Sequence, residues 1–169
     1  MTELLLFYYG SHPDHRGRML AEIVAQDDDW FEQTHDFIQW LFPLSDLSRA
    51  SLRAPLVDGP TRRAFHDDPL LRNHMRVAVS RMVKFLGLRF DGNTVQCADN
   101  WNLRNGAWFV EHSHNSMRIT RMLKSMALLG LRDDALALRT GLEALCENEP
   151  NCGITAESRR FWKEALDKR

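Results

Sequence analysis

The sequence predicts an all-α fold: a single compact domain of about seven helices over residues 1–169, with one very short hairpin near residues 88–97. Three observations support it. The chain has 169 residues, 44% of them apolar, which is enough to close one core. Apolar residues recur at helical spacing along most of the chain, and strand alternation is rare. There is no internal repeat, low-complexity tract or linker to divide the domain.

The first quarter of the chain predicts two helices after the apolar run Leu4–Tyr9. We expect the first to begin at Ser11-His12-Pro13, because proline is tolerated in the first turn of a helix. The second is expected to begin at Asp27-Asp28-Asp29, since acidic residues favour the positive end of the helix dipole, and to end before Pro43. Its predicted buried face is Trp30, Phe31, Thr34, Phe37, Ile38, Leu41 and Phe42.

The middle of the chain predicts a loop, two helices and a hairpin. Residues 44–59 are expected to form a connecting loop that ends in the turn Asp58-Gly59-Pro60. A short helix follows from Pro60, and Asp68-Pro69 begins a longer one that Gly87 ends. Asp91-Gly92 is typical of a tight turn between two very short strands.

Four more helices are predicted after the hairpin. Asp99 or Asn100 is expected to cap a helix that carries Trp101 and Trp108. The helix that begins near Ser113 has an apolar face and ends at Gly130. The last two are expected to begin at Asp133 and at Thr155, whose hydroxyl is a suitable cap.

The charges nearly cancel but are unevenly distributed. The 22 basic and 23 acidic side chains give a net charge of −1, which argues against a generic polyanion binder, so we do not expect a nucleic-acid partner. Residues 1–46 hold nine acidic and two basic side chains, whereas residues 47–132 hold fourteen basic and six acidic ones. Such asymmetry indicates either an interaction surface or two oppositely charged regions that face each other.

Cysteine content and hydropathy predict a cytoplasmic protein. Cys97, Cys146 and Cys152 are odd in number and have no CxxC spacing, which favours a reducing compartment over a disulfide framework or a cysteine zinc site. The longest apolar run has six residues, far fewer than the roughly 18 that a membrane-spanning helix needs. It also lacks the basic flank of a signal peptide.

One stretch rich in functional side chains covers residues 35–44. On a continuous helix His35 and Gln39 would share a face, and so would Asp36 and Trp40. Polar groups beside so many aromatic rings indicate the rim of an apolar groove. The alternative is that Trp40 belongs to the core and the polar groups bond to neighbouring backbone or to one another.

A second such stretch covers residues 111–125. His114, Arg118, Arg121 and Ser125 fall on one helical edge, where two guanidinium groups suit a carboxylate or phosphate. The helix start at residues 112–115 would add backbone N–H donors. The alternative is that these arginines pair with acids of the acidic N-terminal region.

No pattern predicts a metal, a cofactor or catalytic residues. His112 and His114 are two apart, which does not place both on one helix face, and the chain has no HExxH motif. It also lacks the GxSxG, P-loop and GxGxxG motifs. The sequence therefore favours a binding module over an enzyme. The enzyme alternative requires His35 and His114 to converge with a carboxylate such as Asp36.

Both stretches resemble the conserved domain of the opioid growth factor receptor family. The resemblance is carried by THDFIQWLFPL at Thr34–Leu44 and by HNSMRITRMLKSMALL at His114–Leu129. Shorter matches are Phe7-Tyr8, Arg81–Gly87 and Asn100-Trp101. Together they extend over roughly residues 5–166.

The resemblance implies a receptor-type function without catalytic residues. Larger animal members are described as receptors for the enkephalin peptide that ends in Met, associated with nuclear and membrane fractions, so peripheral membrane association is implied as well. Those members carry a long C-terminal extension, whereas this chain ends at Arg169. With 18 Arg and four Lys, we expect a short, stand-alone bacterial member.

These observations together predict a groove between the two helices that binds a short peptide or another small anionic ligand. Trp40 and Trp101 would form its apolar walls, and Arg118 or Arg121 would hold a peptide's terminal carboxylate. A further alternative is a helix-mediated protein-interaction module, which predicts an exposed apolar patch of several hundred Å². The predicted ligand-binding residues are His35, Asp36, Gln39, Trp40, Trp101, His112, His114, Asn115, Arg118 and Arg121.

Overall fold

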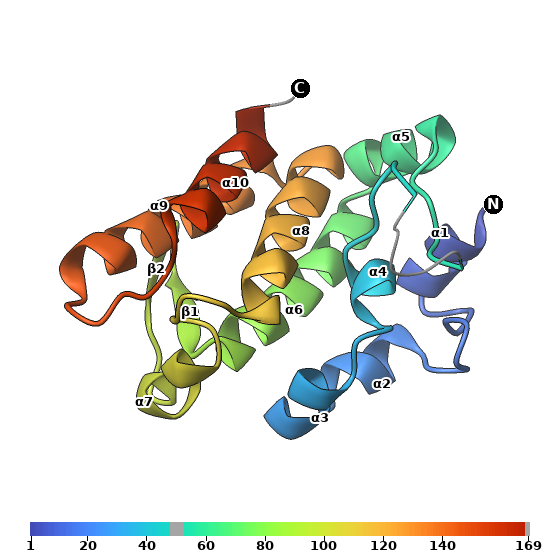
Figure 1. Cartoon of the computed structure of the whole chain (residues 1–169). Helices are drawn as coiled ribbons and strands as arrows, with labels where there is room; N and C mark the ends of the chain where they lie inside the picture. Colours follow the sequence, from blue (N-terminus) through green and yellow to red (C-terminus); the bar gives the residue numbers. More distant parts are fainter. Residues whose placement is uncertain (48–52, 168–169) are drawn as a thin grey trace. The chain divides into compact units, whose positions relative to one another are not determined.

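Helices dominate the computed structural model, which describes residues 1–47 and 53–167 (Figure 1). This part of the chain has ten α-helices, one 3₁₀ helix and one antiparallel hairpin, which confirms the predicted all-α class and its hairpin. The elements are α1 (Glu3–Tyr8), α2 (Leu20–Val24), α3 (Asp28–Gln33), α4 (Ile38–Leu41), α5 (Gly59–Asp67), α6 (Pro69–Phe85), β1 (Leu88–Asp91), β2 (Thr94–Cys97), α7 (Trp101–Arg104), η1 (Asn105–Ala107), α8 (His114–Leu128), α9 (Arg132–Asn148) and α10 (Ala156–Asp167).

Two compact units divide the chain, and the division falls within α6. The N-terminal unit is Met1–Val79 and the C-terminal unit is Ser80–Arg169. The single domain over residues 1–169 stays a prediction. No helix in the described ranges is long and apolar enough to cross a membrane.

The core of the N-terminal unit forms around α1. Phe7 and Tyr8 are fully buried, and the Tyr8 ring packs edge-on against Phe65 of α5 at 4.9 Å between centroids. The Tyr8 hydroxyl donates to the carbonyl of Leu41, and the Tyr8 carbonyl contacts Nδ1 of His74 in α6. The apolar run at the start of the chain therefore connects α4, α5 and α6.

The helix predicted to begin at Ser11-His12-Pro13 begins later, so that prediction is wrong. Helix α2 begins at Leu20, and the Glu22 carboxylate accepts from the Met19 N–H at 2.7 Å. Before it, Asp14 accepts from two backbone N–H groups and holds residues 14–18 as a closed loop. A side chain thus satisfies the N–H groups that a helix would have used.

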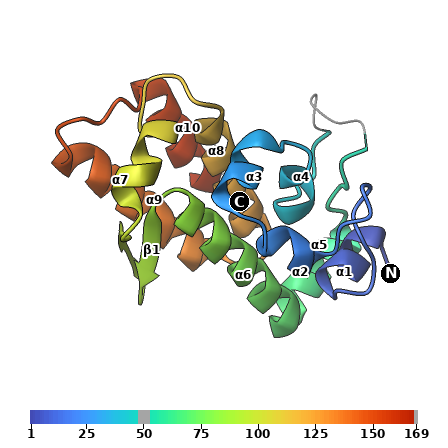
Figure 2. The same cartoon turned by 90° about the horizontal axis from the view of Figure 1, so that it is seen from below.

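The single helix predicted over residues 27–42 is also wrong, because α3 and α4 are separate (Figure 2). Thr34 adopts an extended backbone, with φ −100° and ψ 133°, and ends α3. The apolar face is still buried, since Phe31 and Phe37 pack at 5.0 Å across the break. His35 and Asp36 lie in the connection, so they do not share a helix face with Gln39 and Trp40.

The next elements follow the prediction closely. Asp58 caps α5 by accepting from the Thr61 N–H at 2.8 Å, and α6 begins at Pro69. Of the predicted loop at 44–59, residues 48–52 lie outside the described residues. The Val57 N–H donates to the Leu44 carbonyl at 3.0 Å and ties the two ends of this segment together.

In the C-terminal unit the hairpin packs against α9. Leu88 pairs with Cys97 and Asp91 with Thr94, with Gly92 at φ 60° in the turn. Helix α9 approaches β2 so closely that a Cβ at Gly141 would lie 2.5 Å from the Val95 Cβ. Glycine is therefore required at this contact.

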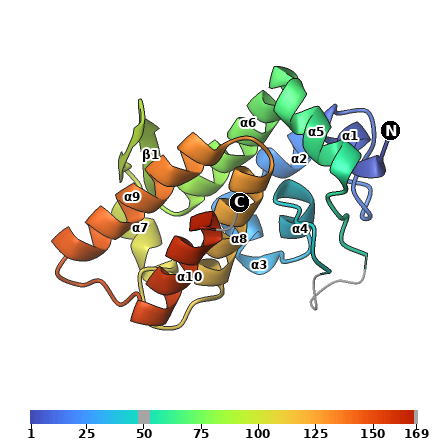
Figure 3. The ribbon, with the colours of Figure 1, turned by 90° about the horizontal axis from the view of Figure 1, so that it is seen from above.

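Helix α8 packs against α9 and α10, as Figure 3 shows. Its start at the Ser113 cap, its buried face and its end before Gly130, at φ 85°, confirm the prediction. Thr155 caps α10, where its hydroxyl accepts from the Ser158 N–H at 3.1 Å. The helix predicted to hold both Trp101 and Trp108 is wrong, because α7 ends at Arg104 and Trp108 follows η1.

Candidate functional site

The predicted site residues divide between the two units. His35, Asp36, Gln39 and Trp40 belong to the N-terminal unit. The others belong to the C-terminal unit: Trp101, His112, His114, Asn115, Arg118 and Arg121.

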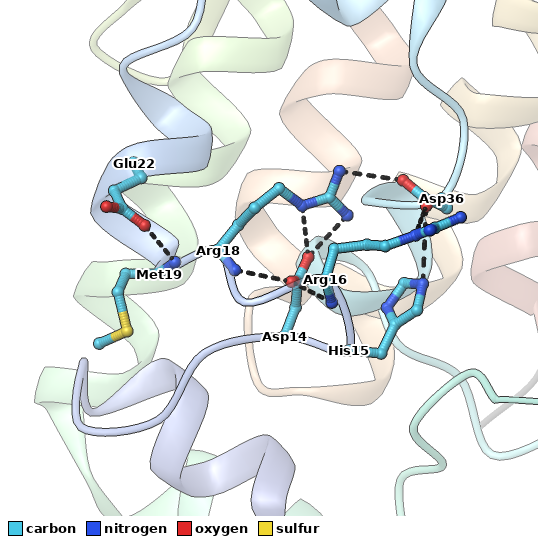
Figure 4. Close-up of polar contacts among 7 residues, drawn as sticks. All are labelled: Asp14, His15, Arg16, Arg18, Met19, Glu22 and Asp36. Carbon is cyan, nitrogen blue, oxygen red and sulfur yellow. Dashed lines mark hydrogen bonds and ion pairs between the residues drawn. The ribbon is translucent and has the colours of Figure 1, made fainter.

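Asp36 lies at the centre of an ion-pair cluster with Asp14, His15, Arg16 and Arg18, which we call the Asp36 cluster (Figure 4). Its carboxylate is 2.8 Å from Arg16 Nε, 3.0 Å from Arg18 Nη1 and 3.6 Å from His15 Nε2. Partial burial acts to raise the pKa of Asp36, but hydrogen bonds from the two arginines outweigh it and lower the pKa. A carboxylate held in this way is a weak base, which argues against Asp36 as the general base of the enzyme alternative.

Asp14 organises the loop that supplies the cations. Its side chain is fully buried and accepts from the backbone N–H groups of Arg16 at 2.8 Å and Arg18 at 2.9 Å. It also pairs with the Arg18 guanidinium through Nε at 2.8 Å and Nη2 at 2.7 Å. The Asp14 N–H donates to the Arg18 carbonyl at 2.9 Å, which closes the loop. The arginines are thus positioned before any ligand arrives.

Two tryptophan rings contact the Asp36 cluster, Trp40 through His15 and Trp30 through Arg18. The His15 ring stacks on Trp40 at 6.2 Å, with an angle of 10° between the planes, and Trp40 packs on Phe7 at 5.2 Å. The Arg18 guanidinium carbon lies 5.5 Å from the centre of the half-exposed Trp30 ring. The exposed fraction is 66% for the Arg16 side chain and 32% for Asp36. Trp30 and the exposed parts of the cluster form one surface, which we call the Asp36 surface.

Gln39 and Trp40 are buried in α4, which agrees with the alternative that Trp40 is a core residue. Among the described residues, Gln39 Oε1 and Trp40 Nε1 have no hydrogen-bond partner. An unpaired buried polar group costs about 1–3 kcal/mol.

At the start of α8, polar side chains bond to backbone and to one another. The Ser113 hydroxyl and the Asn115 amide both donate to the Ala107 carbonyl, at 2.8 Å and 3.1 Å. Asn115 Oδ1 accepts from Arg118 Nη1 at 3.3 Å, and both residues are buried. His114 is exposed on the same helix, and Arg121 is half-buried, with a pKa that burial lowers.

Trp101 and His112 have different surroundings in the same unit. The half-buried Trp101 ring packs edge-on against Trp108 at 6.0 Å and Phe109 at 5.3 Å. His112 is 88% exposed, with Nε2 3.7 Å from Glu111 Oε1. In the described ranges no three or more His, Cys, Asp or Glu side chains form a group that could hold a metal ion.

Comparison with known families gives a match along most of the chain. The opioid growth factor receptor (OGFr) conserved region matches residues 5–151. The chain belongs to the OGFr family. It is 38% identical to the opioid growth factor receptor of Mus musculus over 106 residues, which cover 61% of this chain and 16% of the relative.

Other OGFr-family proteins match over similar lengths. The opioid growth factor receptor of Homo sapiens is 35% identical over 61% of this chain, and 15% of its own length is covered. Opioid growth factor receptor-like protein 1 of Mus musculus is 32% identical over 72% of this chain, and 27% of it is covered. The chain thus spans less than a third of these relatives. No solved structure matches it.

Sequence patterns did not identify the cations around Asp36 in this OGFr-family chain. Arg16 and Arg18 are the only two basic side chains among residues 1–46. Both form ion pairs with Asp36, so part of the negative charge of residues 1–46 is neutralised locally. Their proximity to Asp14 in the sequence is the signal that could have indicated a closed loop.

Proposed function

We propose that this OGFr-family chain is a receptor-type module that binds a short peptide, and that the Asp36 surface contacts the peptide. Family membership supports the receptor-type class. The observation that carries the site is the arrangement of one carboxylate, two guanidinium groups and a half-exposed indole on one pre-organised loop and its neighbours. A small peptide offers complementary groups for each of them.

The charges of the Asp36 surface suit both ends of a peptide. The Asp36 carboxylate accepts from a terminal ammonium group, and the Arg16 guanidinium binds a terminal carboxylate through two parallel hydrogen bonds. An aromatic side chain of the peptide would pack on the exposed part of the half-buried Trp30 ring, and such ring packing adds about 0.5–1.5 kcal/mol. Partly exposed ion pairs such as Arg16 with Asp36 are worth only about 0–1 kcal/mol, so a ligand can replace them at little cost.

The ligand we propose is an enkephalin-like peptide that ends in Met. The relatives carry the name opioid growth factor receptor, and the same ligand class is extended here to this chain. Of the two α8 arginines, Arg121 suits a ligand carboxylate better, because Arg118 is only 6% exposed. His114 and His112, both exposed, are further polar contacts in the C-terminal unit.

Calorimetric titration with the Met-terminated enkephalin tests this proposal. We expect it to bind more tightly than a scrambled peptide of the same composition and than its C-terminal amide. Asp36→Asn and Arg16→Ala should each weaken binding about tenfold, equivalent to about 1.4 kcal/mol. The matched control is Arg160→Ala, which removes an arginine of similar exposure, 61%, from a surface ion pair of α10. Equal affinity for the scrambled peptide would exclude the peptide-binding function.

A further inference from the structure

The hairpin of the C-terminal unit has one edge that no other strand covers. In the described ranges its sheet consists of β1 and β2 alone. Helix α9 packs against β2, and Figure 3 shows the hairpin projecting beyond the helices of this unit. Apart from the bonds to β2, no backbone hydrogen bond of the described residues reaches β1. The outer edge of β1 is therefore open, and an open edge is a template for another strand.

The register of the hairpin shows which backbone groups of β1 face outward. The Ala98 N–H donates to the Gly87 carbonyl at 2.8 Å, so these two residues, which continue the ladder, are a hydrogen-bonded pair. Bonded and non-bonded pairs alternate along an antiparallel ladder, so the second and fourth residues of β1 bond to β2. The first and third residues, Leu88 and Phe90, direct their N–H and C=O groups away from β2, toward the open edge.

Exposure alternates along β1 and divides the hairpin into two faces. Leu88 is buried and Phe90 is half-buried on one face, whereas Arg89 and Asp91 are exposed on the other. Gln96 of β2 joins the two charged side chains, because it accepts from Arg89 Nη2 at 3.1 Å and donates to Asp91 Oδ2 at 3.2 Å. Strand β1 thus carries a positive and a negative side chain on the same exposed face, on either side of Phe90.

We propose that the outer edge of β1 is a homodimer interface, where β1 pairs antiparallel with β1 of a second copy of this chain and the two hairpins form one continuous sheet. The charges indicate this occupant. When Phe90 lies opposite Phe90 of the second copy, the two-fold axis places each Arg89 opposite Asp91 of the other copy. Opposite charges directly across from each other stabilise a strand pair. The outward N–H and C=O groups of the two Phe90 residues then bond to each other.

The same charges disfavour the competing register. A two-fold axis at Arg89 would place Leu88 opposite Phe90 and form more backbone hydrogen bonds, but it would also place Arg89 opposite Arg89 of the second copy. Like charges directly opposite each other destabilise a strand pair. Charged side chains on an edge ordinarily prevent pairing, whereas here they exclude one register and favour the other. Because the strand is short, the interface is small, and we expect a weak dimer with a dissociation constant of about 0.1–1 mM.

Sedimentation velocity of the full chain at concentrations up to about 1 mM tests the proposal. We expect the wild type to form a dimer as its concentration rises. Arg89→Asp and Asp91→Arg each place like charges opposite each other, so each should weaken the dimer at least about tenfold. An equimolar mixture of the two variants should restore the dimer, because every charge then faces its opposite. The matched control is Arg160→Asp, which reverses an exposed charge of α10 and should leave the dimer unchanged.

A chain that carries both Arg89→Asp and Asp91→Arg gives a second test, because it restores the complementary charges within one sequence. It should dimerise as the wild type does, and circular dichroism checks that each variant is folded. A wild type that stays monomeric at about 1 mM would overturn the proposal. A dimer that neither single reversal weakens, or a double variant that stays monomeric, would also overturn it. Tighter pairing of Arg89→Asp with the wild type than with Asp91→Arg would assign the register centred on Arg89 and contradict the one proposed.

Discussion

The Asp36 cluster and the start of α8 both combine arginine with polar neighbours, but they differ in exposure. Arg16 is 66% exposed and pairs with a carboxylate that is 32% exposed. Arg118 is 6% exposed and donates to the amide oxygen of the fully buried Asn115. The first arrangement holds its charge at the surface, whereas the second holds it in a buried position.

This difference decides which arginines a ligand can use. An exposed ion pair can open, because water and a ligand replace its partners at a cost of about 0–1 kcal/mol. A buried guanidinium that leaves its partners strands polar groups, at about 1–3 kcal/mol each. We therefore expect substitutions of buried charged residues to lower the free energy of unfolding. Substitutions of the exposed residues of the Asp36 cluster should instead weaken peptide binding.

The largest effect is expected from Asp14→Ala. Asp14 is the buried member of the cluster, and its loss leaves Nε and Nη2 of Arg18 and two backbone N–H groups without this acceptor, while Arg18 Nη1 keeps its contact with Asp36. We expect the free energy of unfolding to fall by about 3 kcal/mol. Urea denaturation followed by circular dichroism measures it. Asp46→Ala, which removes an exposed carboxylate, is the control, and equal losses in the two variants would contradict the anchoring role.

A smaller loss is expected from Arg118→Ala, at about 2 kcal/mol, because the substitution removes the hydrogen bond to Asn115 Oδ1 and buried packing. Arg121→Ala should cost about 1 kcal/mol or less, since Arg121 is only half-buried. The same urea denaturation compares the two. If Arg118→Ala retained full stability but lost peptide binding, Arg118 would be a ligand residue and the distinction between the two arrangements would be wrong.

The start of α8 could be predicted from sequence because its determinants are local. Ser113 caps the helix, the apolar face recurs at helical spacing, and Gly130 ends it at positive φ. Each of these signals acts within one or two turns. The burial of Arg118 was not predictable, because its place on the edge of α8 depends on what packs beside that edge.

The Asp36 cluster was not predictable in the same way. Apolar spacing over residues 27–42 correctly marks Phe31 and Phe37 as buried, but two short helices bury them as well as one long helix would. No proline or glycine marks the break at Thr34. The contacts of Asp36 with Arg16 and Arg18 cross about twenty residues, and a helical pattern has no information about them.

The smallest effect on the free energy of unfolding is expected from Asp36→Asn, and it should depend on pH. Because its pKa is lowered in the folded chain, Asp36 contributes stability that is present above its unfolded pKa of about 3.9 and is lost as pH falls through the lower folded value. Asp36→Asn should therefore cost about 0.5–1 kcal/mol at neutral pH, and the difference from wild type should begin to shrink below pH ~4 and vanish only below the lower folded pKa.

Urea denaturation across pH 3–7 measures this difference, with Asp46→Asn as the exposed control. A difference that grew on acidification would mean that burial dominates and the Asp36 pKa is raised. In that case the arginines would not be stabilising the Asp36 charge, and the proposed pairing with a peptide ammonium group would lose its support. The sign of this pH dependence therefore tests whether the exposed arrangement keeps the charge that ligand binding requires.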